Sequence, residues 1–163
     1  MSAVTIFWMQ ILTSVFVIGF VAVVYVGPFL ARLPRQSALI LLLFVHVFRY
    51  VGMTLLVPGM VDPKLPAGFL EAAAYGDLLE AALAFASIVV LRLNLSAAVV
   101  LVWVTNIWGF ADLLNGLRGV VQLNVPSFYL GAAWYIYTFY APVVVLSHLM
   151  IFWLLVKYRS WKR

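Results

Sequence analysis

The sequence has no cysteine in its 163 residues. This absence excludes disulfide bonds, thiolate metal sites, thioredoxin-like redox chemistry and covalently attached c-type haem. Lysine is also scarce and stands only in loops or at segment ends, at Lys64, Lys157 and Lys162. A retinal Schiff base needs a lysine inside the apolar part of the chain, so the sequence argues against a retinal protein.

Charged residues make up only 9% of the sequence, whereas hydrophobic residues make up 67%. A soluble domain is about half apolar and about a quarter charged. A chain of this length cannot bury so much apolar surface in its own interior, so we expect a lipid bilayer to surround it. The net charge is +5, but the basic residues stand at the ends of apolar segments. We therefore expect no nucleic-acid partner.

Five apolar runs predict five transmembrane helices, because each is close to the ~20 residues that cross a hydrocarbon layer of ~30 Å. Backbone groups in lipid must be hydrogen-bonded internally, and long continuous runs favour helices over strands. The first run has no basic segment before it and is too long for a signal peptide, so we expect it to be retained. The predicted fold is an all-α, up-down bundle in one transmembrane domain over residues 1–163. Its spans are 4–26, 38–57, 69–91, 96–117 and 128–156.

Basic residues predict the orientation of the bundle. They follow the first, third and fifth runs, at Arg32, Arg35, Arg92, Lys157, Arg159, Lys162 and Arg163. Only Lys64 and Arg118 lie on the other side. Because cytoplasmic loops carry an excess of Lys and Arg, we expect the N-terminus outside and the C-terminus inside, in a bacterial-type cytoplasmic membrane or an organellar inner membrane. The C-terminal segment KYRSWKR is either this orientation signal alone or also a contact with anionic headgroups.

Four ionisable residues stand inside the second and third runs. His46 and Arg49 are three residues apart, as are Asp77 and Glu80, so each pair shares one face of a helix. At ~1.5 Å per residue, Arg49 and Asp77 lie ~12 Å below the outer end of their spans, and the other two lie ~16 Å below it. We therefore expect Arg49 to meet Asp77 and His46 to meet Glu80. Such pairing removes the ~2.5–3.5 kcal/mol cost of a lone charge at mid-bilayer.

Further polar residues occur in the fourth and fifth runs. The fourth carries Thr105, Trp108, Asp112 and Asn115 at helical spacing, with Asn106 on a neighbouring face, and the fifth carries Tyr135, Tyr137, Thr138 and Tyr140. Pro142 follows and predicts a kink. Most of these groups fall in the outer half of the bundle and predict a polar pocket that opens outward. The predicted ligand- or ion-binding residues are His46, Arg49, Asp77, Glu80, Asp112, Trp108, Asn115 and Tyr137.

The favoured function is the binding or transport of a small molecule or ion, with proton coupling as one form of it. Ionisable residues inside a membrane are costly and are functional by default, although an ion-paired core that only fixes helix register is the simpler alternative. No metal site and no cofactor are expected in this interpretation. The partners it implies are the bilayer, the small ligand and, in some arrangements, a second copy of the chain.

Three other functions stay open from the sequence. A b-type haem could be held by His46 and His148, which lie at equal depths from the inner ends of their spans. A membrane enzyme on a lipid-like substrate could use His46 or Glu80 as acid or base, although no HExxH, GxSxG or phosphate-loop motif is present. An accessory subunit of a larger membrane complex could pack through Gly19, Gly27 and the alanine-rich face of the third run.

Overall fold

The structure is a computed structural model that describes residues 1–157. These residues form helices and connecting turns, and no strand occurs among them. Arg159, Lys162 and Arg163, which contributed to the predicted orientation, lie outside the described residues, as does most of the C-terminal basic segment. Five helices are long and apolar enough to cross a membrane, as the sequence predicted.

The five long helices contain several irregular segments. The first consists of α1 (Ala3–Val21), the π-helical η1 (Ala22–Val26) and α2 (Gly27–Leu30). The second consists of α3 (Arg35–Val47) and the 3₁₀-helical η2 (Phe48–Leu56). The third and fourth are α4 (Ala67–Arg92) and α5 (Ala98–Gln122), followed by the short turn η3 (Val125–Ser127). The fifth consists of α6 (Ala133–Tyr135), the π-helical η4 (Ile136–Tyr140) and α7 (Ala141–Lys157).

Several predicted boundaries differ from the structure. The first helix continues past residue 26 to Leu30, and the second begins at Arg35 instead of residue 38. The fourth helix continues past residue 117 to Gln122, because the first residue in a left-handed conformation comes only at Asn124. The fifth helix begins at Ala133 instead of residue 128. Residues 128–132 are not helical because η3 contains Pro126 and because Gly131 has a φ of +49°, both of which interrupt a regular helix. Backbone conformations of this kind are not visible in hydropathy.

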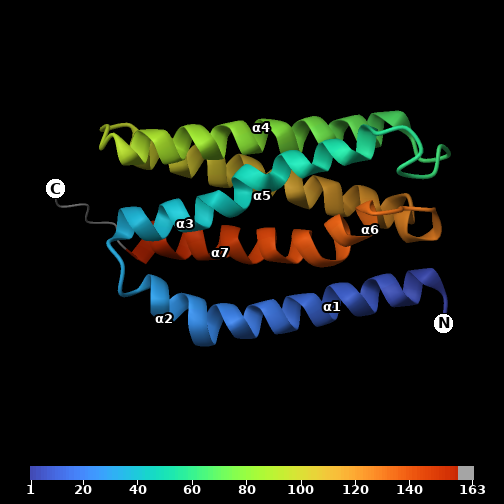
Figure 1. Cartoon of the computed structure of the whole chain (residues 1–163), viewed down its shortest axis with the longest axis horizontal. Helices are drawn as coiled ribbons and strands as arrows, with labels where there is room; N and C mark the ends of the chain where they lie inside the picture. The colour runs from blue at the N-terminus through green and yellow to red at the C-terminus, as the bar shows by residue number, and fades with distance from the viewer. Residues whose placement is uncertain (158–163) are drawn as a thin grey trace.

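Successive long helices run in opposite directions along the length of the bundle, which is horizontal in Figure 1. The N-terminus and the connections 57–66 and 123–132 lie at one end, and the connections 31–34 and 93–97 lie at the other. α4 packs against α3, η2 and α5, while α3 also packs against α7. α1 lies at the margin and contacts α7 and η4. Only 6% of the residues in the most apolar stretch of this first helix are buried, against 28–44% in the other four helices.

The buried core has two apolar clusters with a polar layer between them. One cluster lies towards the end that carries the connections 31–34 and 93–97 and includes Leu39, Leu43, Leu91, Val102 and Leu154. The other lies towards the end that carries the N-terminus and includes Phe7, Leu55, Leu65, Val120 and Leu130. The polar layer between them includes the buried residues His46, Arg49, Glu80, Thr105, Asn106, Ser147 and His148 and the partly exposed Asp77 and Asp112. Apolar clusters therefore lie on both sides of the polar layer along the bundle, while the side chains of Asp77 and Asp112 are partly exposed.

Two irregular segments border this layer. η2 runs for nine residues as a 3₁₀-helix and carries Arg49, although 3₁₀ runs longer than about four residues are uncommon and often mark hinges. η4 is a π-helical turn that ends two residues before Pro142, where the sequence predicted a kink. Where α3 changes into η2, the hydroxyl of Tyr140 donates to the carbonyl oxygen of Val45 at 2.6 Å. The second and fifth helices are therefore linked at the polar layer.

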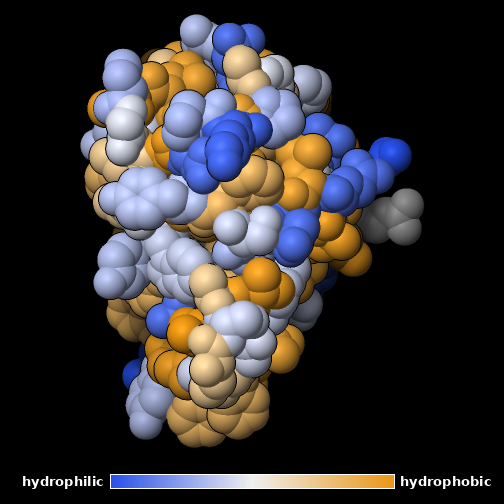
Figure 2. Space-filling model, turned by 90° about the vertical axis from the view of Figure 1, so that its right-hand side faces the viewer, coloured by the Kyte–Doolittle hydropathy of each residue, from blue (hydrophilic) through white to orange (hydrophobic). Residues whose placement is uncertain are grey.

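Figure 2 looks onto the end of the bundle that carries the N-terminus and shows hydrophilic residues interspersed with hydrophobic ones. Asp62 and Lys64 belong to the connection at this end, where the Asp62 carboxylate accepts from the Lys64 backbone N–H at 2.9 Å. No large domain follows from any connection, since each joins two neighbouring helices within ten residues or fewer. The chemistry of the described residues must therefore arise within the helices or at their ends.

Candidate functional site

Arg49 joins three helices inside the polar layer. Its side chain is 2% exposed, and its Nε donates to Oδ1 of Asp77 on α4 at 2.7 Å. Its Nη2 lies 2.6 Å from the same oxygen and donates to Oδ2 of Asp112 on α5 at 2.7 Å. Its Nη1 donates to the carbonyl oxygen of Gly109 at 3.0 Å. The predicted pairing of Arg49 with Asp77 is confirmed, and Asp112 is a second partner.

His46 and Glu80 also lie side by side, one turn deeper than the Arg49 pair. Nδ1 of His46 is 3.7 Å from Oε1 of Glu80, a distance that allows an ionic contact but is too long for a hydrogen bond. Both side chains are fully buried. The other ring nitrogen of His46, Nε2, lies 2.8 Å from Oγ of Ser147 on α7. The predicted proximity is confirmed, but Glu80 does not hydrogen-bond the imidazole.

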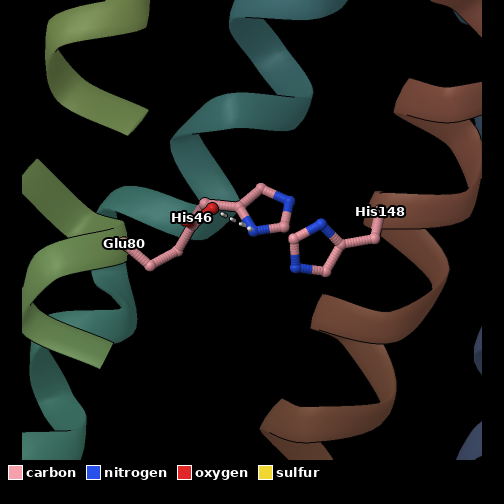
Figure 3. A group of neighbouring side chains, drawn as sticks. All are labelled: His46, Glu80 and His148. Atoms are coloured by element: carbon pink, nitrogen blue, oxygen red, sulfur yellow. Dashed lines mark ion pairs between the residues drawn. The ribbon is translucent and has the colours of Figure 1, made fainter. Parts of the chain in front are cut away.

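His148 completes the deeper group from α7. Its ring centroid lies 4.1 Å from that of His46, with an angle of 53° between the rings. Figure 3 shows the two rings facing one another between α3 and α7, with Glu80 approaching His46 from α4. Nδ1 of His148 lies 2.8 Å from Oδ1 of Asn106, and Nδ2 of Asn106 donates to the His148 carbonyl oxygen at 3.3 Å. Nothing in the sequence indicated that His148 lies beside Glu80 or Asn106.

The spacing of the two histidines does not fit the haem alternative. A bis-histidine haem has its porphyrin plane between the two axial imidazoles. Rings with centroids 4.1 Å apart leave no space for such a plane, and both rings are fully buried among protein side chains. This geometry instead places two imidazoles beside one carboxyl group.

Four buried atoms of this group have no hydrogen-bond partner among the described residues. They are Nδ1 of His46, Nε2 of His148 and both carboxyl oxygens of Glu80. An unsatisfied buried polar atom costs about 1–3 kcal/mol, so such a concentration needs an explanation. The three side chains each offer one ligand atom, and these atoms lie within 4.8 Å of one another. The arrangement can therefore coordinate a cation, although no metal site was expected from the sequence.

Each of the three carboxyl groups of the layer packs against a glycine of a neighbouring helix. A Cβ added at Gly52 would overlap Asp77, one at Gly76 would overlap Asp112, and one at Gly109 would overlap Glu80. The three pairs are therefore Gly52 with Asp77, Gly76 with Asp112 and Gly109 with Glu80. Each carboxyl group approaches the backbone of a neighbouring helix so closely that only glycine fits there. This signal was present in the sequence, but it becomes readable only once the helix neighbours are known.

The layer holds three carboxyl groups but only one side chain that is always cationic, because its two histidines can be neutral. Arg49 is its one guanidinium within the described residues, and it pairs with Asp77 and Asp112 but not with Glu80. Asp77 and Asp112 are paired with Arg49 and are partly open, with side chains 20% and 18% exposed. Glu80 is fully buried, and its ionic contact among the described residues is with the imidazole of His46 at 3.7 Å. With all three acids ionised and both histidines neutral, two negative charges have no counter-charge.

Three of the predicted site residues lie apart from these contacts. Trp108 is 46% exposed and Asn115 is also exposed. The buried residues of α5 in this region are Thr105, Asn106 and Gly109. The face of α5 that points into the bundle is therefore displaced by about one residue from the predicted face, which included Trp108. Because a helix turns about 100° per residue, this displacement moves a side chain to a different surface. The Tyr137 hydroxyl is buried and has no hydrogen-bond partner in residues 1–157, and its ring centroid lies 6.2 Å from that of Phe7 on α1.

An open groove occurs elsewhere, between α1 and η4. Its volume is about 420 Å³, and polar side chains of Gln10, Thr13, Ser14, Tyr135 and Thr138 share its lining with apolar residues. None of the ionisable residues of the polar layer lines it. The groove is therefore distinct from the polar layer, where the sequence predicted a pocket that opens outward.

Comparisons with known proteins identify the family of the chain but no activity. Residues 6–156 match the family model described as Domain of unknown function (DUF8737), and the chain belongs to that family. No curated protein and no solved structure matches the chain.

Proposed function

We propose that this protein is a multi-pass membrane protein that binds a small cation in its core and transports it across the bilayer with proton coupling. The polar layer formed by His46, Arg49, Asp77, Glu80 and Asp112 is the binding site in this proposal. Its position between two apolar clusters is suited to a site that is closed to water on both sides while it is occupied.

The five long apolar helices support insertion in a membrane. The basic residues support an orientation with the N-terminus outside and the C-terminus inside, as in a bacterial cytoplasmic membrane. Arg32, Arg35 and Arg92 border the connections 31–34 and 93–97 at one end of the bundle, together with Lys157 at the end of α7. Lys64 and Arg118 are at the opposite end.

The excess of carboxyl groups in the polar layer is the observation that carries the proposal. A core built only to fix helix register needs balanced charges, because an uncompensated charge in a low-dielectric interior is costly. Three carboxyl groups and one guanidinium are unbalanced while both imidazoles are neutral, and protons bound to Glu80 or the imidazoles, or a metal cation, restore the balance. Glu80 is the group that needs this compensation most, since it is fully buried and has no hydrogen-bond donor among the described residues.

The layer also supports a route for the cation. Asp77 and Asp112 are partly exposed, Arg49 holds both of them, and Glu80 lies deeper on the same face of α4 as Asp77. A cation that reaches the aspartates competes with Arg49 for their oxygens. Arg49 belongs to the 3₁₀-helical η2, and such segments are often hinges, so a movement of η2 is the step by which we expect the aspartates to be released.

Transport is tested in vesicles that contain the purified protein and a pH-sensitive dye. A potassium gradient with valinomycin sets the voltage, and the rate of internal pH change is compared with that of empty vesicles. We expect wild-type protein to accelerate proton entry, and Glu80→Gln to lower the rate to that of empty vesicles. Glu71→Gln is the matched control, because Glu71 is an exposed residue of the same helix.

A second set of vesicles contains a metal-sensitive dye and receives Zn²⁺ or Mn²⁺ outside. Entry of the metal that depends on Glu80 but not on Glu71 supports the same site. Wild-type protein that moves neither protons nor these metals faster than empty vesicles contradicts the proposed transport.

A further inference from the structure

We infer that His46, Glu80 and His148 bind one divalent first-row transition-metal ion where α3, α4 and α7 meet (Figure 3). This inference rests on the proposed function and deepens it, because it names the class of cation that the core binds. Its basis is the convergence of three side chains whose free atoms are all lone-pair donors.

The three side chains are close enough to share one ion. Their ligand atoms lie within 4.8 Å of one another. Ligands at about 2.0–2.2 Å from a tetrahedral ion lie about 3.3 Å apart, so side-chain movements of about 1 Å close the site. Glu80 can make such a movement because its carboxyl group has no hydrogen bond to break among the described residues.

Asn106 fixes which nitrogen of His148 faces the site. Its Nδ2 donates to the His148 carbonyl oxygen, so its Oδ1 is the atom that lies 2.8 Å from Nδ1 of His148. An amide oxygen only accepts, and Nδ1 must therefore carry the proton. The lone pair of the neutral ring is then on Nε2, which is buried and has no hydrogen-bond partner within the described part of the chain. Metal-binding histidines commonly donate their second nitrogen to an oxygen in this way.

Ser147 fixes which nitrogen of His46 faces the site. Its hydroxyl donates to the Val144 carbonyl oxygen at 2.9 Å, which leaves Oγ to accept from Nε2 of His46 at 2.8 Å. The lone pair of this ring is therefore on Nδ1, the atom that faces Glu80 at 3.7 Å. Both imidazoles thus present an unprotonated nitrogen towards a carboxyl group that also has only lone pairs to offer when it is ionised.

A metal ion satisfies this group better than a proton or a water molecule does. A proton on Glu80 can serve one acceptor, and a water molecule can donate to two. A metal ion accepts lone pairs from all three side chains at once. A divalent ion also supplies the two positive charges that the layer lacks when all three of its carboxyl groups are ionised.

The ligand set indicates the class of metal. Imidazole favours zinc, iron, nickel and copper, whereas Mg²⁺ and Ca²⁺ prefer sites made of oxygen ligands only. Two histidines and one carboxylate are three protein ligands, which leaves at least one position for water or an exchanging group. Such an incomplete coordination sphere is suited to an ion that must enter and leave.

The test measures metal binding by the full-length protein, purified without a histidine tag. The sequence has only two histidines and no cysteine, so few other strong metal ligands compete. Zn²⁺ is added, the protein is passed through a desalting column, and metal per chain is measured by mass spectrometry. Co²⁺ is titrated in parallel, because its visible absorption reports coordination by nitrogen and oxygen directly. The variants are His148→Gln and Glu80→Gln, with Glu71→Gln as the control.

We expect wild type and Glu71→Gln to retain one Zn²⁺ per chain and to show the Co²⁺ absorption. His148→Gln and Glu80→Gln should bind Co²⁺ at least tenfold more weakly while eluting as monodisperse protein. The inference is overturned if wild type retains no metal and gives no Co²⁺ absorption, a result that does not depend on any variant. It is also overturned if His148→Gln retains metal like wild type. Proton transport that depends on Glu80 in a protein without metal binding overturns this inference alone and leaves the proposed transport intact.

Discussion

Glu80 of α4 lies against Gly109 of α5, and its carboxyl group fills the space that a Cβ at position 109 would need. The same glycine accepts a hydrogen bond from Arg49 through its carbonyl oxygen. One backbone position of α5 therefore borders both the Arg49 contacts and the His46, Glu80 and His148 group. Changes at this position should affect both parts of the polar layer.

Gly109→Ala should displace the Glu80 carboxyl group. Overpacking of a core costs about 1–3 kcal/mol, so we expect a lower free energy of unfolding together with loss of cation binding. Gly116→Ala is the control on the same helix, since no atom lies within 4 Å of a Cβ there. Alanine is a better helix former than glycine by about 0.5–1 kcal/mol, so this control should be neutral or stabilised. Unfolding in detergent and Co²⁺ titration measure the two effects, and equal behaviour of the two variants would argue against the close packing of Glu80.

Arg49→Met should destabilise the protein more than Asp77→Asn does. Without Arg49, both Asp77 and Asp112 lose their partner, whereas in Asp77→Asn the guanidinium keeps Asp112 and the Gly109 carbonyl oxygen. Removing one partner of a buried ion pair costs about 3–5 kcal/mol, and we expect Arg49→Met to approach that range.

The double variant, Arg49→Met with Asp77→Asn, tests the pair itself. Because it removes one of the two stranded carboxylates, it should be more stable than Arg49→Met alone. A double-mutant cycle of unfolding free energies gives the coupling energy between the two residues. Additive effects in this cycle would show that the pair does not interact in the folded protein.

Tyr140→Phe should loosen the junction between α3 and η2. The hydroxyl donates to the Val45 carbonyl oxygen at 2.6 Å, and a net hydrogen bond contributes about 0.5–1.5 kcal/mol. If this bond restrains the movement of η2, the rate of transport changes as well as the stability. Tyr50→Phe is a suitable control because Tyr50 belongs to η2 but is 48% exposed. The vesicle flux assay and thermal unfolding separate the two effects; identical values for both variants would remove Tyr140 from the account.

Asn106→Ala should weaken metal binding without removing a ligand. The His148 ring loses the oxygen that keeps its proton on Nδ1, and loss of such an outer partner lowers metal affinity about 10- to 100-fold. Asn106→Asp retains an acceptor at this position and should restore much of the affinity. Co²⁺ titration of both variants measures this difference. Similar affinities for Ala and Asp would mean that Asn106 does not orient the ring.

Several features of the fold and the site were predictable from the sequence. Hydropathy predicted five helices, and the depth of each ionisable residue along its run predicted that Arg49 meets Asp77 and His46 lies beside Glu80. Both inferences depend on position along a single helix, which the sequence states directly. They succeed because two antiparallel helices of similar length align residues of equal depth.

The features that were missed depend on rotation and on contacts between distant helices. The inward face of α5 contains Asn106 and Gly109, but its spacing alone also fits a face with Trp108, which is exposed. His148 was recognised only as a possible haem ligand, because nothing in the sequence indicates that it faces Glu80 from 68 residues away. The start of the fifth helix was missed because the left-handed Gly131 leaves no mark in hydropathy.

The most direct test of cation binding in the core is infrared difference spectroscopy of the protein in lipid nanodiscs. Spectra are recorded before and after addition of Zn²⁺, and before and after a change of pH. We predict that a carboxyl band of the wild type responds to an added cation, that the response persists in Glu71→Gln, and that it is absent from Glu80→Gln. A wild-type spectrum in which no carboxyl band responds to either treatment, or a response that is unchanged in Glu80→Gln, would contradict the account.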